Sequence, residues 1–186
     1  MPHIEVYTAN VGEKDLPRSD VRCFTSYNRF RDPRLNAKIY KVLPHLFIDA
    51  EFSIWVDANI ELMVTPESLV SRMTADVMVY RHWDRDCLYE EASVCAINKQ
   101  DDTAILQEQS REYNRRGITH NGGLAACGVI VRRHCDSVAA SNQKWWAEIC
   151  RYSVRDQVSF LVAFPDAQAW PHDPRGTEIK IHDHIR

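Results

Sequence analysis

The sequence lacks the patterns that mark membrane, secreted and nucleic-acid-binding proteins. No apolar run approaches the roughly 18 residues of a membrane helix. The first residues, Met1-Pro2-His3-Ile4-Glu5, lack the basic and apolar segments of a signal peptide. The net charge of -3 and the pI near 6.2 provide no general basic field for nucleic acid. We therefore expect a cytoplasmic protein that has no transmembrane segment and binds no nucleic acid.

Glycine and paired cysteine are also scarce. None of the six cysteines forms a C-x-x-C pair, so we expect small buried side chains rather than a zinc site. The strand expected at residues 4–8 leads into a loop with only Gly12, without a full dinucleotide-binding fingerprint. A chain of 186 residues with 45% hydrophobic residues fits one domain, residues 1–186, and buries roughly 70% of its unfolded surface.

A short apolar run that ends in polar residues is the most informative stretch. Phe52 to Val56 predicts a buried strand, and Asp57 and Asn59 follow it two residues apart. Side chains alternate along a strand, so these two can point to one side. Two oxygen donors suit Mg²⁺ or Mn²⁺. A simple turn explains Asp-Ala-Asn equally well, because both residues bond readily to nearby backbone.

The order of the expected elements predicts an α/β fold with a mostly parallel sheet and helices on both faces. Further strands are expected at 21–25, 76–80 and within 122–134, and helices at 32–43, from 65, from 85, at 103–115, at 135–152 and from 153. Ligands collect at the carboxyl ends of parallel strands. Asp57, Asn59 and His82 fall at such ends.

Charged side chains on the expected helices each have an ordinary structural explanation, which stands beside any functional role. Arg34, Lys38 and Lys41 form a basic stripe that is either a solvated face or a diphosphate contact. Glu90 and Glu91 begin a helix, where acids complement the helix dipole. Ser153 with Asp156 resembles a capping box, which gives Asp156 a purely structural alternative.

Two histidines near the end of the sequence alternate as ligands would. His182 and His184 lie on one side of an extended segment. Either is a candidate for a late metal ligand.

Five blocks of the sequence together resemble a family of bacterial and plant proteins, first catalogued as a domain of unknown function and then grouped with GT-A glycosyltransferases. The blocks are Tyr7-Thr8 with Gly12, Ala37 to His45, Ser53 to Asn59, Arg85 to Ala92, and Arg155 to Phe160. They occur in family order and cover most of the chain.

The resemblance implies a Rossmann-like GT-A fold for nucleotide-diphospho-sugar transfer, with Asp57-Ala58-Asn59 in place of the Asp-x-Asp metal motif. It implies a hexosyltransferase-like reaction from a nucleoside-diphosphate sugar, expected to be a UDP-sugar, to a glycan or other acceptor, as in polysaccharide biosynthesis. The second acid is an amide here, which removes one formal charge from the metal site.

The resemblance also suggests roles for individual residues. On the donor side we expect Tyr7, Thr8, Gly12, Arg34, Lys38, Asp57 and Asn59. Mn²⁺ or Mg²⁺ is expected at Asp57 and Asn59 with His182 or His184. On the acceptor side we expect His82, Glu90, Glu91 and Gln157, with Asp156 as general base or as a sugar-orienting group. Two alternatives stay open, a non-catalytic nucleotide- or sugar-binding module and a metal-dependent hydrolase.

Overall fold

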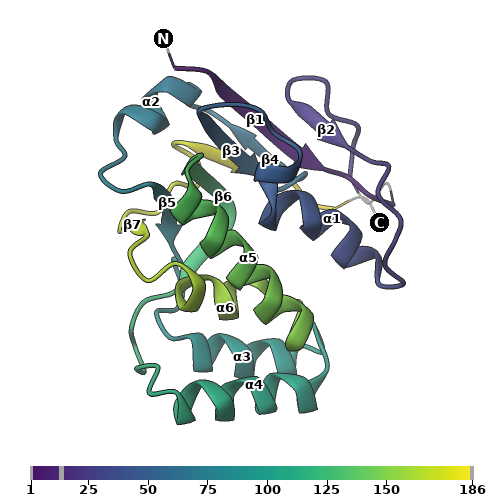
Figure 1. The fold of residues 1–186 in the computed structure, drawn as a ribbon, viewed down its shortest axis with the longest axis vertical. Coiled ribbons are helices and arrows are strands. Elements are labelled where there is room, and N and C mark those ends of the chain that lie inside the picture. Colours follow the sequence, from purple (N-terminus) through teal and green to yellow (C-terminus); the bar gives the residue numbers. More distant parts are fainter. Residues whose placement is uncertain (1, 13–14, 185–186) are drawn as a thin grey trace.

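A mixed six-stranded sheet forms the centre of the computed structural model, which describes residues 2–12 and 15–184 (Figure 1). Its strand order is β2-β1-β3-β6-β5-β7. The strands are β1 (Ile4–Ala9), β2 (Arg22–Phe24), β3 (Phe52–Val56), β5 (Val77–Arg81), β6 (Ala125–Arg133) and β7 (Gln168–Trp170). β6 runs antiparallel to β3 and β5, whereas the other neighbours pair in parallel. The expected α/β fold is confirmed, but the sheet is mixed.

Helices and a small second sheet cover the two faces. The remaining elements are α1 (Pro33–Val42), the 3-10 turn η1 (Pro44–Leu46), β4 (Ile60–Leu62), α2 (Pro66–Ser71), α3 (Leu88–Ile97), α4 (Thr103–Arg115), α5 (Asp136–Arg151), α6 (Asp156–Ala163) and β8 (Ile179–Ile181). α1, α5 and α6 pack on one face, whereas α2 and the β4-β8 pair pack on the other. α3 and α4 lie side by side at one end of the molecule (Figure 1).

β3 shows why the sheet needs cover on both faces. All five of its residues are buried. Ile54 and Val56 face the layer of α2 and β4, and Trp55 between them faces α1 and α5. A continuous apolar run therefore marks a central strand, as the sequence indicated. Within the described residues, no helix is long and apolar enough to span a bilayer.

Local capping signals were partly right. Asp32 caps α1 by accepting a hydrogen bond from the Arg34 amide at 2.9 Å, as expected. The capping box at Ser153 is wrong, because Arg155 is the N-cap of α6 and Asp156 is its first helical residue. The Ser153 hydroxyl donates to Asp101 at 2.9 Å instead. α3 begins at Leu88, later than the expected start at residue 85.

The small residues of β6 are explained by close packing. A Cβ atom on Gly128 would lie 2.6 Å from Cδ1 of Ile60 and 3.6 Å from Oδ2 of Asp57. Ile60 belongs to β4, so the second layer approaches the strand here. Glycine at position 128 consequently gives room to the Ile60 side chain, whereas Asp57 would be in ordinary van der Waals contact with an added Cβ.

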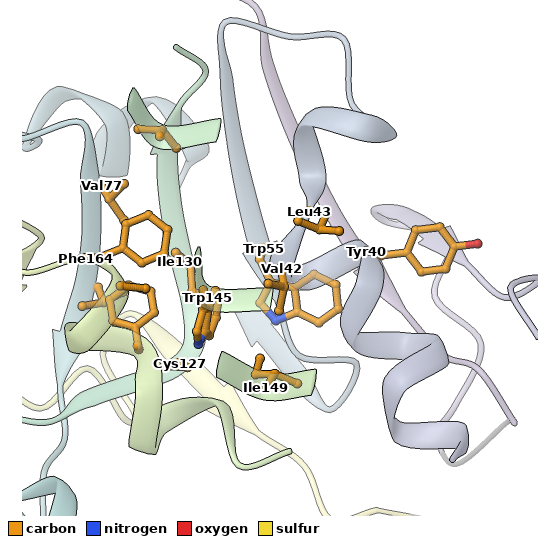
Figure 2. Close-up of a cluster of buried hydrophobic side chains, with 14 of the residues drawn as sticks. Tyr40, Val42, Leu43, Trp55, Val77, Cys127, Ile130, Trp145, Ile149 and Phe164 are labelled. Carbon is orange, nitrogen blue, oxygen red and sulfur yellow. The ribbon is translucent and has the colours of Figure 1, made fainter. Parts of the chain in front are cut away.

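Trp145 of α5 is the largest fully buried side chain on the helical face, and Figure 2 shows it within the core beside Trp55 and Ile149. Its ring centroid lies 5.0 Å from Phe160 and 5.9 Å from Phe164. Its indole N–H donates to the backbone oxygen of Asp156 at 3.2 Å. The core is thus joined directly to the start of α6.

Trp145→Ala should lower the free energy of unfolding by about 3–5 kcal/mol, because it removes a full indole and leaves a cavity. Urea denaturation measures the loss. Trp146→Ala is the matched control, since Trp146 is only partly buried and packs on Phe30. Equal losses in the two variants would contradict the assigned position of the core.

Candidate active site

A cavity of about 500 Å³ opens at the carboxyl ends of β1 and β3. Residues 9–11 and 57–59 line it, together with 126–128 from the start of β6. Because β2 and β3 lie on opposite sides of β1, the chain order reverses here. Such a switch point is where open α/β sheets bind ligands. α1 and the first turn of α6 close the cavity from the helical side.

Lys41 of α1 is the central side chain of this cavity. Only 4% of the residue is exposed. Its ammonium nitrogen lies 2.9 Å from Oδ1 of Asp57 and 2.6 Å from Oδ2 of Asp156. Burial alone would lower the pKa of Lys41, but the charges of Asp156 and Asp57 outweigh it and raise the pKa. Lys41 is therefore a permanent cation held between two carboxylates.

Asp57 is fixed on one of its two oxygens. Oδ1 accepts from Lys41 and also from the indole N–H of Trp55 at 2.7 Å. Asp57 and Asn59 form the turn into β4, with the Ile60 amide donating to the Asp57 backbone oxygen at 2.8 Å. The two alternatives raised by the sequence are compatible, since the segment is a turn and both polar side chains line the cavity.

Asp156 is a buried carboxylate between two ammonium groups. Lys38 lies 3.1 Å from its Oδ2, the same atom that Lys41 contacts. Burial would raise the pKa of Asp156, but the charges of Lys38, Lys41 and Arg155 hold the pKa well below its usual range. A carboxylate that holds its proton so weakly is a poor base. Burial lowers the pKa of Lys38 although Asp156 acts in the opposite direction.

The expected metal ligands are only partly assembled. Asp57, Asn59 and His184 line the cavity, whereas His182 does not. His184 Nδ1 lies 2.7 Å from Asp15, and His182 Nε2 lies 3.1 Å from Glu61. Among the described residues, no three side chains of His, Cys, Asp or Glu lie together so that they could hold a metal ion.

The oxygens that remain fit an ion shared with a ligand. Oδ1 of Asp57 already accepts two hydrogen bonds, which leaves Oδ2. The Asn59 amide nitrogen donates to the His182 backbone oxygen at 3.0 Å, which leaves the amide oxygen. Mg²⁺ is commonly held by one or two such oxygens together with substrate phosphate and water. The pair fits that kind of ion and does not form a site by itself.

Other expected donor-side residues lie in different surroundings. Tyr7 and Thr8 are fully buried, and the Tyr7 ring packs against Trp55 with centroids 5.3 Å apart. Gly12 adopts a φ of +84° in the turn after β1 and does not line the cavity. Arg34 lines the cavity, but its guanidinium binds Asp32 and Asp101 at 2.8 and 3.3 Å.

The expected acceptor-side residues divide between two cavities. Gln157 lines the first, and its side-chain oxygen accepts from Arg155 at 3.2 Å. His82 and Glu90 line a second cavity of about 410 Å³ beside it. Glu91 is buried, with Arg85 donating to its Oε2 at 2.7 Å. It therefore positions an arginine and does not itself face a cavity.

Several side chains of the first cavity were not assigned from the sequence. They are Asn10, Asp15, Lys41, Trp55, Trp83, Cys127 and Arg155. The sequence contained a signal for two of these residues. Lys41 shares the basic stripe of α1, and Trp55 precedes Asp57 by two residues and so points to the same side. Burial raises the pKa of Cys127 well above its usual value, so its thiol is not an activated nucleophile.

Comparisons with known proteins find one family and two relatives. A family model described as the TOD1/MUCI70 glycosyltransferase-like domain matches residues 23–170. The chain is 30% identical over 145 residues to an Arabidopsis thaliana protein named probable hexosyltransferase MUCI70, covering 70% of this chain and 25% of that protein. It is 29% identical over 154 residues to alkaline ceramidase TOD1 of the same plant, covering 75% and 33%. The chain spans a third or less of these relatives, and no solved structure matches it.

Asp156→Asn should lower the free energy of unfolding by about 3–5 kcal/mol, because it removes the carboxylate that the buried Lys41 and the partly buried Lys38 share. The lowered pKa means that the native stabilisation is complete above the unfolded pKa of about 3.9 and is lost as the pH falls below it. The parent should therefore lose stability in acid more steeply than the variant.

Urea unfolding between about pH 3 and pH 7 measures both effects. Asp166→Asn, at an exposed carboxylate just after α6, is the control and should leave stability and its pH dependence unchanged. Parallel acid profiles for the parent and Asp156→Asn would refute the ion network.

Proposed function

The chain belongs to the TOD1/MUCI70 glycosyltransferase-like family, and from this membership we propose that it is a hexosyltransferase-type enzyme. It transfers a sugar from a nucleoside-diphosphate sugar, most simply a UDP-sugar, to a hydroxyl of an acceptor. The observation that carries the proposal is the pair of ammonium groups, Lys38 and Lys41, in the cavity at the switch point of the sheet. A dianionic leaving group needs cations at such a place.

The leaving diphosphate sets the chemical demand on this cavity. In glycosyl transfer, the bond between the anomeric carbon and a phosphate oxygen breaks, and its electron pair leaves with the diphosphate. The acceptor oxygen bonds to the anomeric carbon as this charge develops. Lys38 and Lys41 supply positive charge from a rigid helix, so little reorganisation accompanies the reaction.

Asp156 holds the two lysines in place rather than taking the acceptor proton. Its lowered pKa makes it a weak base, and its Oδ2 is already in contact with both ammonium nitrogens. Asp156 was expected to act as general base or to orient the sugar. Its contacts with Lys38 and Lys41 disfavour the first role and give it a third one, the positioning of the two lysines. The acceptor proton passes to water or to an oxygen of the departing diphosphate.

A divalent cation completes the proposed donor site. Asp57 through Oδ2 and Asn59 through its amide oxygen would hold Mn²⁺ or Mg²⁺ together with the diphosphate. When bound, such an ion supplies Lewis-acid neutralisation of phosphate oxygen. A hydrolase centred on the histidines has less support, because His182 and His184 each pair with a different carboxylate.

Lys38→Ala should weaken UDP binding roughly 10- to 100-fold, the worth of one charge-assisted contact of about 1.5–3 kcal/mol. The fold should survive because Asp156 keeps Lys41. UDP titration by calorimetry at low and high salt measures the affinity, and the salt dependence should flatten in the variant. Lys144→Ala, at an exposed position of α5, is the matched control. Equal UDP affinity in Lys38→Ala and Lys144→Ala would show that Lys38 does not contact the diphosphate and has a structural role only.

Asp57→Asn should abolish the extra stabilisation that Mn²⁺ gives in the presence of UDP and leave stabilisation by UDP alone. The amide keeps an oxygen for Lys41 and Trp55, whereas the negative charge and the second oxygen, which would hold the cation, are lost. Thermal unfolding with UDP, Mn²⁺, both and chelator measures this, and UDP at ~100 times its dissociation constant should add about 2.7 kcal/mol.

Asn59→Asp is the converse variant and should increase the Mn²⁺ effect. If Mn²⁺ adds nothing to UDP in the parent, or adds equally in Asp57→Asn, the metal part of the proposal is wrong. Stabilisation by UDP alone would still support the donor site.

A further inference from the structure

A second cavity lies beside the first and shares one residue with it. This cavity of about 410 Å³ lies at the carboxyl end of β5 and is lined by residues 81–86, Glu90 and residues 171–173. Trp83 lines both cavities. A ligand in the second cavity would thus lie next to the proposed sugar donor.

His82 presents an unpaired donor to this cavity. The residue is only 9% exposed, and its Nδ1 accepts from the amides of Asp84 and Arg85 at 3.2 Å each. Because Nδ1 is an acceptor, the hydrogen of the neutral ring lies on Nε2. Burial and the charge of Arg85 lower the pKa of His82, which keeps the ring neutral.

Arg85 brings a second donor to the same point. Its Nη2 lies 3.4 Å from Nε2 of His82, and both atoms carry hydrogen, so they do not bond to each other. The guanidinium is fixed from behind by Glu91, which accepts from its Nε at 2.7 Å and is only 2% exposed. Two rigid donors therefore converge and call for an oxygen acceptor between them.

Glu91 also connects the two cavities. Its Oε1 lies 3.7 Å from Nη2 of Arg155, which lines the first cavity. One buried carboxylate thereby orients an arginine on each side. The relative position of the two cavities is fixed by this contact and by Trp83.

We propose that the second cavity is the acceptor subsite and that it binds a saccharide, with an oxygen of the sugar accepting from both His82 and Arg85. This inference rests on the proposed glycosyl transfer for its role but not for its binding chemistry. The lining consists mainly of charged side chains with Trp83 and Pro171, which suits a molecule rich in hydroxyl groups. A lipid chain would find few apolar partners there.

The sugar's own hydroxyl groups match the other side chains. Asp84, Asp86, Glu90 and Asp173 provide carboxylate oxygens that accept from hydroxyl groups. A saccharide carries donors and acceptors on each ring, so it satisfies both kinds of group at once. Trp83 lies at the boundary with the donor cavity, stacked on His82 and with the Arg175 guanidinium 4.6 Å from its ring centroid.

The test measures saccharide binding without nucleotide. Cellotetraose, maltotetraose and tetragalacturonate are titrated by saturation-transfer NMR, and ceramide in detergent micelles is the lipid arm. At least one tetrasaccharide should bind the parent, and the neutral and acidic probes distinguish which sugar chemistry is preferred. His82→Gln and Arg85→Lys should each weaken that binding by about 10-fold or more, since each disrupts one of the two donors.

His120→Gln is the control, at an exposed histidine that lines neither cavity, and should bind as the parent does. Thermal unfolding of each variant, with and without UDP, checks that the fold and the donor cavity persist. Unchanged saccharide affinity in both cavity variants, ceramide binding in place of saccharide, or no binding of any tetrasaccharide would overturn the acceptor subsite. If UDP does not raise the unfolding temperature of the parent, the donor proposal is refuted, and saccharide binding stands as a separate result.

Discussion

The contacts of Lys41 with Asp57 and Asp156 are the interaction on which the rest of the site depends. They join α1, the end of β3 and the start of α6 at one edge of the sheet. Buried ion pairs rarely stabilise a fold more than apolar packing does, because removing charges from water is costly. A network of this kind at the switch point of an α/β sheet is therefore better explained by a charged ligand than by stability.

The same network decides what each charged group can do chemically. Asp156 holds its charge at all ordinary pH values, so it acts as an anchor for cations and not as a proton acceptor. Lys41 remains protonated for the complementary reason. Asp57 has one oxygen engaged and one free, which suits an ion that arrives with phosphate. Positioning and electrostatics thus account for the proposed reaction better than acid-base exchange within the cavity.

The two named relatives carry different activities in their names, a hexosyltransferase and a ceramidase. The chain matches only a quarter to a third of each relative, so these names do not establish an activity for the chain. The chemistry of the cavities supports the first kind of activity, since cations meet a switch-point cleft and the neighbouring cavity is polar. Glu91 contacts an arginine of each cavity and Trp83 lines both, so the two cavities adjoin, as the proposed transfer requires.

The sequence by itself determined most of the elements, although β4 and β7 were not predicted. Continuous apolar runs identified β3 and β5, and Asp32-Pro33 identified the start of α1, because these signals depend on local backbone preferences and periodicity. Asp57, Asn59 and Lys38 were predicted because they follow a strand or lie on a helical stripe within a recognisable family block, and all three line the first cavity.

Only the tertiary structure decided which charges meet. Asp156 looked like a cap, yet α1 and α6 bring it to Lys38 and Lys41, more than a hundred residues away in the chain. The antiparallel direction of β6 and the burial of Tyr7 were likewise undetermined, since neither follows from a local pattern. A residue's charge is written in the sequence, but its partner and its exposure depend on the packing of distant elements, and these set its pKa and its function.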